Sequence, residues 1–155
     1  MQLSKQKSEG FTLVEIMIVV LIIGILAAMS YPAFMKVKTH SQASRLANDF
    51  RTFSGLFVTY SMDNGTYPPD AGAGTMPDGM ADYIKSDNWV TQTPIGGNYD
   101  WDFNGYSGTP VATIAITGFT AGMDPVEKLD EIMDDGNLGT GIIQSSSGRV
   151  VFIIE

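Results

Sequence analysis

Apolar residues run almost without a break from Phe11 to Met35, and then recur every three or four positions further along the chain. The 21 residues from Phe11 to Tyr31 would form a helix of roughly 30 Å, the thickness of the hydrocarbon core of a bilayer. The later pattern is typical of a helix with one buried face. It comprises Ala43, Leu46, Ala47, Phe50, Phe53, Phe57 and Tyr60.

These patterns predict one long helix over residues 11–61, of which 11–31 lie in a membrane and the remainder packs against a soluble head at 62–155. Pro32 removes a backbone donor and clashes with the preceding turn, so we expect the helix to kink or melt locally there. Gly24 is a second position where we expect a kink, because glycine is unfavourable in the interior of a helix.

The head has the signals of a small mixed domain. Turn-forming pairs at Asn64-Gly65 and Pro68-Pro69 end the long helix. A second helix is predicted to follow Asp124 as its N-cap, with Pro125 at its first position, and to end at Gly136. A short helix is predicted at 78–85 and a hairpin turn at 145–148. Strands are predicted at Trp89–Thr93, Tyr99–Phe103, Val111–Thr117, Ile142–Ser145 and Arg149–Ile154. The fold class is therefore α+β, with a small antiparallel sheet on the helix stripe.

Glu15 is out of place in the apolar segment, because a carboxylate inside a membrane costs a few kcal/mol and needs a partner. A polar segment with Lys5 and Lys7 precedes it and ends at Gly10, just before Phe11. Cleavage after Gly10 would give Phe11 a free amino group. A copy displaced by about one helical turn, roughly 6 Å, could use that cation to neutralise Glu15 and so fix the axial register. A cleaved secretory signal or a plain signal anchor would leave Glu15 unexplained.

The run "GFTLVEIMIVVLIIGILAA", with the Lys-bearing leader before it and Pro32 after it, resembles the class III signal of type IV pilins and type II secretion pseudopilins. The resemblance extends from Gly10 to about Lys38. It implies a type IV pilin fold and a leader, residues 1–10, that a prepilin peptidase removes between Gly10 and Phe11. It also implies N-methylation of Phe11 and a requirement for Glu15 in filament assembly.

The resemblance further implies a single-pass protein of the bacterial inner membrane with its head in the periplasm. Lys36 and Lys38 would lie on the soluble side, so the leader's lysines are expected to set this orientation. An inner-membrane assembly platform would then extract the subunit into a periplasmic or extracellular filament of this and other pilins.

These features lead to three hypotheses about the function of the protein. The favoured one is a pseudopilus subunit for type II secretion, supported by the short head, the absence of cysteine and the "NGTYP" phrase after the helix. The second is a pilin of a type IV pilus used in adhesion or motility. The third is a membrane-anchored binding domain that does not polymerise, and it predicts that Glu15→Ala is tolerated.

Composition argues against several other functions. The net charge of −8 disfavours nucleic acid as a partner, because phosphate binding requires a basic surface. There is no cysteine and a single histidine, His40, expected on an exposed helix face. No nucleophile–histidine–acid set or phosphate-binding loop is evident, so we do not expect an enzyme or a zinc site.

One loop carries oxygen ligands. The sequence "DDGNLGTG" places Asp134, Asp135 and Asn137 in a glycine-rich segment, and such ligands suit Ca²⁺. Major pseudopilins are similar in having a calcium site in an acidic C-terminal loop, but this chain has "TPIGGNYDW" where their "DPWG"-type phrase is expected. The alternative is a solvated helix end without a cofactor. The aromatic residues Trp89, Tyr99, Trp101 and Phe103 are expected in the core rather than in a ligand platform.

Overall fold

The computed structural model describes residues 10–104 and 111–154. The chain divides into two compact units, Met1–Val37 and Lys38–Glu155. The predicted leader, apart from Gly10, lies outside the described residues.

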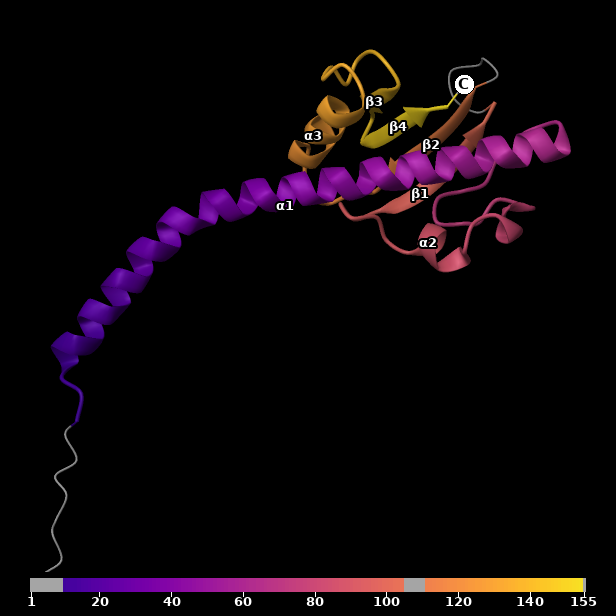
Figure 1. The fold of residues 1–155 in the computed structure, drawn as a ribbon. Helices are drawn as coiled ribbons and strands as arrows, with labels where there is room; N and C mark the ends of the chain where they lie inside the picture. Colours follow the sequence, from indigo (N-terminus) through magenta and orange to yellow (C-terminus); the bar gives the residue numbers. More distant parts are fainter. Residues whose placement is uncertain (1–9, 105–110, 155) are drawn as a thin grey trace, which may run out of the picture. The chain divides into compact units, whose positions relative to one another are not determined.

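The dominant element is helix α1, Leu13–Asn64, which contributes to both units (Figure 1). It begins two residues later and ends three residues later than the predicted 11–61 helix. The helix continues through Gly24 and Pro32 without a break, so the local melting considered for Pro32 does not occur. The kink at these two positions stays a prediction. By length and composition, α1 contains a segment that can cross a membrane, and that segment is exposed.

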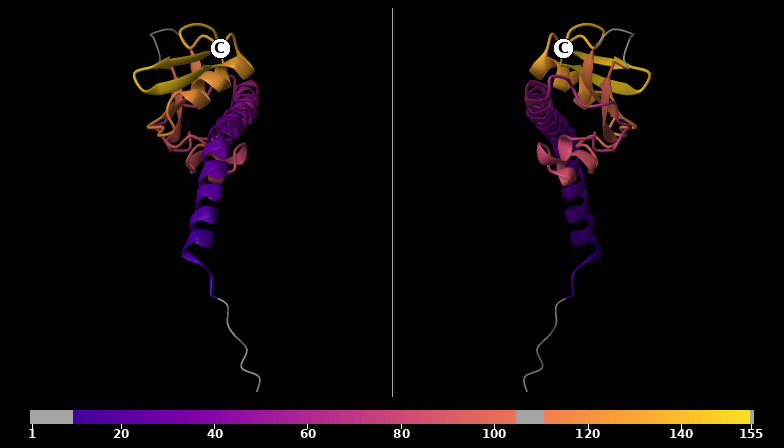
Figure 2. Two further views of the ribbon diagram at one scale, coloured as in Figure 1. Left: turned by 90° about the vertical axis from the view of Figure 1, so that its left-hand side faces the viewer. Right: turned by 90° about the vertical axis from the view of Figure 1, so that its right-hand side faces the viewer.

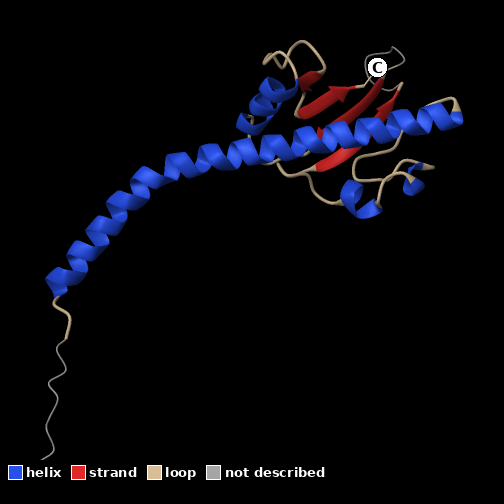
Figure 3. Ribbon diagram, in the orientation of Figure 1, coloured by secondary structure: helices blue, strands red, loops and turns tan. Residues whose placement is uncertain are grey.

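The head contains a four-stranded antiparallel sheet (Figure 3). Its strands are β1 Asn98–Phe103, β2 Ala112–Thr117, β3 Ile143–Ser146 and β4 Arg149–Ile153, in the order β1-β2-β4-β3. Ser147 and Gly148 connect β3 to β4 with φ angles of 52° and 76°, as a two-residue hairpin with the matching twist requires. The α+β class and four of the five predicted strands are confirmed.

The fifth predicted strand, Trp89–Thr93, is wrong. Residues Ser86–Val90 form the short helix α2, in which Trp89 is buried and its Nε1–H donates to the Thr75 carbonyl at 2.8 Å. Burial of one large ring and its hydrogen bond decide the local conformation, and they override the strand preference of aromatic and β-branched residues.

The other helices differ from prediction mainly at their ends. The predicted 78–85 helix is reduced to one 3₁₀ turn, η1, Met80–Asp82. Helix α3 spans Asp124–Met133, with Met123 rather than Asp124 at its N-cap, and it ends three residues before Gly136.

The core of the head lies between the second half of α1 and the inner face of the sheet (Figure 2). Six of the seven predicted stripe residues are buried, and Tyr60 is partly buried. Phe57 stacks on Trp101 with ring centroids 3.7 Å apart, and Phe50 stacks on Phe152 at 5.2 Å. Trp89, Tyr99 and Trp101 are buried in this core, so their assignment to packing is confirmed.

Candidate functional site

The N-terminal end of α1 is built as a capping box. Thr12 precedes the first helical residue, and its hydroxyl oxygen accepts from the Glu15 N–H at 3.2 Å. In return, the Thr12 N–H and hydroxyl both donate to Oε2 of Glu15, each at 2.7 Å. The S/T-x-x-E spacing satisfies two helix-end donors and holds the carboxylate in place. Thr12 was absent from the predicted site, although the "TLVE" spacing was sufficient to identify it.

The residues flanking this box are exposed. Phe11 is 82% exposed, and a Cβ added to Gly10 would meet no atom within 4 Å. Nothing in the described chain therefore requires glycine at position 10. The described part of the first unit has no buried residue, and its large apolar side chains from Phe11 to Val37 are all exposed. Such a surface requires a covering of lipid or of other apolar helices.

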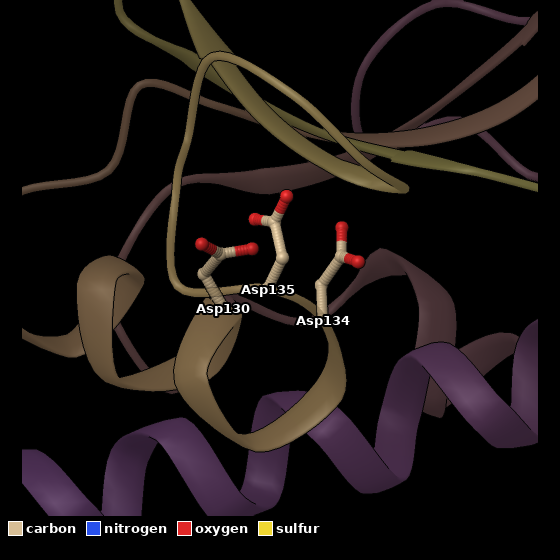
Figure 4. Close-up of side chains that lie close together, drawn as sticks. All are labelled: Asp130, Asp134 and Asp135. Atoms are coloured by element: carbon tan, nitrogen blue, oxygen red, sulfur yellow. The ribbon is translucent and has the colours of Figure 1, made fainter.

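An acidic cluster lies at the C-terminal end of α3 (Figure 4). Asp130, Asp134 and Asp135 each offer a carboxylate oxygen, and these oxygens lie within 4.8 Å of one another. Asp130 is fully buried, and neither of its oxygens has a hydrogen-bond partner among the described residues. Burial raises the pKa of Asp130, and the charges of Asp134 and Asp135 raise it further.

The other two carboxylates organise the loop that follows α3. Oδ2 of Asp134 accepts from the backbone N–H groups of Ile142 and Ile143. The oxygens of Asp135 accept from the Asn137 N–H and the Thr140 hydroxyl, both at 2.8 Å. These bonds fold the loop back over α3, so that Asp134 and Asp135 lie beside Asp130.

The structure thus brings two of the three predicted metal residues together, along with one that was not predicted. The side-chain oxygen of Asn137 accepts from the Gly139 N–H at 3.1 Å and serves the turn. Asp130 was missed because an acid in the middle of an amphipathic helix resembles a solvated residue. A buried carboxylate that lacks a hydrogen-bond partner fits a cation, since a buried charge must be compensated.

Two further features lie outside the capping box and the acidic cluster. His40 is exposed on α1, as predicted. On β1, Asp100 and Asp102 both accept from Arg149 on β4, at 2.7 and 2.5 Å. Burial raises the pKa of Asp100, the Asp102 charge adds to this effect, and Arg149 opposes it.

Comparison with known proteins places these features in a family. Residues 5–31 match the prokaryotic N-terminal methylation motif. Fimbrial protein EcpC of Eikenella corrodens is 36% identical over 120 residues, covering 77% of this chain and 71% of the relative. Type II secretion system core protein G of Klebsiella michiganensis is 30% identical over 148 residues, covering 86% of this chain and 94% of the relative.

A solved structure shares the fold. The major type IV pilin PilA1 from Clostridium difficile has a TM-score of 0.54 at 17% identity, covering 75% of this chain and 96% of that structure. The likeness confirms a long N-terminal helix on a small antiparallel sheet as a pilin fold. The chain therefore belongs to the family of type IV pilins and type II secretion pseudopilins, and it is a structural subunit of a pilus or pseudopilus filament.

Proposed function

We propose that this chain is a pseudopilin, a subunit of the pseudopilus that serves type II protein secretion. The alignment over nearly the whole length of the Klebsiella michiganensis core protein G supports this assignment. Members of the family are structural subunits and not enzymes. The similarity to a fimbrial protein over a shorter share of that relative supports the alternative, a pilin of a type IV pilus.

The proposed processing of the N-terminus is the one that the N-terminal methylation motif at residues 5–31 indicates. A prepilin peptidase cuts between Gly10 and Phe11 and methylates the new amino group of Phe11. The exposure of Phe11 supports this step, as does the lack of any packing reason for glycine at position 10. A small residue that the fold does not need is consistent with recognition by an external enzyme.

Membrane insertion precedes assembly in this proposal. The subunit is held in the inner membrane by the exposed apolar half of α1, with its head in the periplasm. The methylation motif and the apolar helix fit this anchoring. An assembly platform then moves the helices into a filament, where they bury the same apolar surface against other pilins.

The capping box explains how Glu15 is accommodated before assembly. Thr12 supplies two donors to Oε2, so the carboxylate is hydrogen-bonded within its own chain. Oε1 has no partner among the described residues and is free to accept from the Phe11 amino group of a neighbouring subunit. Thr12 is thus a positioning residue for Glu15, and its loss should weaken the helix end by about 1 kcal/mol.

A calcium site at the end of α3 is the second part of the proposal. Asp130, Asp134 and Asp135 would hold the cation, and oxygen ligands of this kind suit Ca²⁺. A bound cation would neutralise the buried charge of Asp130 and tie α3 to the following loop. The orphaned oxygens of Asp130 are the observation that supports it.

Mass spectrometry of the N-terminal peptide from wild-type cells tests the processing. We expect a peptide that starts at methylated Phe11, and an intact leader would refute the assignment. Imaging should show filaments in cells that express the wild type and none in cells that express Glu15→Ala. A non-polymerising anchored domain would form filaments in neither, and Glu15→Ala would leave its membrane anchoring unchanged. Deletion of the gene separates the two filament types: exoproteins retained in the periplasm indicate a pseudopilin, and loss of surface pili with normal secretion indicates a pilin.

A further inference from the structure

A polar groove of about 740 Å³ lies on the head, between the second half of α1 and the segment that joins α2 to β1. Arg45, Asp49 and Thr52 line it from α1, and Asn88, Gln92 and Tyr99 line it from the other side. All of these residues belong to the second unit. The volume is in the range of binding pockets, and most of the lining side chains can form hydrogen bonds.

Hydrogen bonds within the free subunit fix the two walls of the groove relative to each other. The Tyr99 hydroxyl donates to Oδ2 of Asp49 at 2.7 Å, and both residues line the groove. The Gln42 side-chain amide donates to the Pro94 carbonyl at 2.8 Å and fixes the α2–β1 segment to α1. An occupant would therefore meet preformed walls, which reduces the entropic cost of docking.

The groove offers a cation to its occupant. Arg45 is exposed and forms no ion pair within the described part of the chain. The one acid lining the groove, Asp49, already accepts the Tyr99 hydroxyl. Arginine beside amide side chains is suited to binding carboxylates through several hydrogen bonds.

The same head carries a matching acidic face on α3. Asp124, Glu127 and Glu131 are exposed at spacings of three and four residues, so they share one side of the helix. Glu131 pairs with Lys128, whereas Asp124 and Glu127 form no ion pair among the described residues. The face therefore retains uncompensated negative charge.

In the view of Figure 1, helices α2 and α3 lie on opposite sides of the second half of α1. The groove and the acidic face are therefore two different patches of one head. A contact between two different patches of identical copies is head-to-tail, and its repetition gives an open helical polymer when the rotation between copies does not close a ring.

We propose that the groove around Arg45 receives the acidic face of α3 from a second copy of this chain. The inference rests on the proposed filament function and names the surfaces through which neighbouring heads meet. Rim charges of this kind set register and partner choice more than raw affinity. The contact would add to the helix packing in the filament core.

Charge reversal provides the first test. Arg45→Glu should lower the yield of filaments in cells at least tenfold, and so should Glu127→Arg, while the double variant restores most of the yield. Arg51→Glu is the matched control, because Arg51 is also exposed on α1 but does not line the groove. Unchanged melting of the head, read from Trp89 and Trp101 fluorescence, excludes misfolding. Normal filaments from Arg45→Glu would overturn the inference.

Cysteine cross-linking gives a second readout, since the chain has no cysteine of its own. Thr52→Cys combined with Glu127→Cys, which leaves Asp124 and Glu131 on the acidic face, should produce a ladder of oligomers when the filaments that still form are oxidised. The matched control replaces Glu127→Cys by Ser146→Cys, an exposed position on the edge strand β3. Filaments that form but give no ladder, or that give the same ladder with the control pair, refute the contact and leave the filament function standing. Absence of filaments from the wild type would refute both the proposed contact and the proposed filament function.

Discussion

Replacement of Asp130 by asparagine should have opposite effects on the head with and without calcium. Asparagine keeps the shape of the side chain and removes its charge. In the metal-free protein, the fully buried carboxylate has no hydrogen-bond partner among the described residues and lies within 4.8 Å of two other acids. Removal of its charge should therefore stabilise the metal-free head.

The magnitude follows from the spacing of the charges. Two unit charges no more than 4.8 Å apart repel by at least about 3 kcal/mol at an effective dielectric constant near 20. Solvent around the partly exposed Asp134 and the exposed Asp135 reduces this, so we expect a gain of about 1–2 kcal/mol. Calcium at about 100 times its Kd stabilises the wild type by about 2.7 kcal/mol, and the variant should lose most of that effect.

The assay is thermal unfolding of the mature protein in detergent, followed through the fluorescence of Trp89 and Trp101, which are both buried in the head. With EDTA, the melting temperature of Asp130→Asn should lie roughly 4–8 °C above that of the wild type. With calcium, the melting temperature of the wild type should increase by about 10 °C and exceed that of the variant. Glu127→Gln, an exposed acid of the same helix, is the control for a general charge effect. A wild-type melting temperature that calcium leaves unmoved would refute the metal site, and a variant less stable in EDTA would refute the electrostatic reasoning.

Two further changes test the packing and the ion pairs of the head. Phe57→Ala removes a fully buried ring that stacks on Trp101, so chemical denaturation should show a loss of about 3–5 kcal/mol; a loss below about 1 kcal/mol would contradict the assigned core. Arg149→Met leaves Asp100 and Asp102 without their shared cation and should cost about 2 kcal/mol at pH 7. Because the pKa of Asp100 is already raised and rises further without Arg149, its protonation in acid relieves the repulsion. The difference in the free energy of unfolding between Arg149→Met and the wild type should therefore decrease as the pH falls. A difference that stays constant from pH 7 to pH 4 would contradict this account.

The long helix and the sheet could be predicted from the sequence because their signals are local. The apolar run from Phe11 and the stripe from Ala43 to Tyr60 have the length and period of a helix. The strand segments alternate or are continuously apolar, and a short turn separates the last two. These patterns depend on which face each residue buries, and burial follows from hydrophobicity with little help from tertiary context.

The remaining features depend on contacts between distant segments. Trp89 belongs to a helix because its ring fills the core beside Phe53 and Phe57 and its N–H reaches Thr75. Asp130 becomes part of an acidic cluster only after the following loop folds back over α3. Neither contact has a local signature, whereas the capping box between Thr12 and Glu15 did have one and could have been predicted.

The most direct test of the central claim is a reconstruction of the assembled filament at a resolution that shows side chains. The measured quantity is the distance from the Phe11 nitrogen of one subunit to the Glu15 carboxylate of its neighbour. We predict an ion pair, with the two groups within about 4 Å. A Glu15 carboxylate that faces only solvent or lipid, with no amino group from another subunit in reach, would contradict the account.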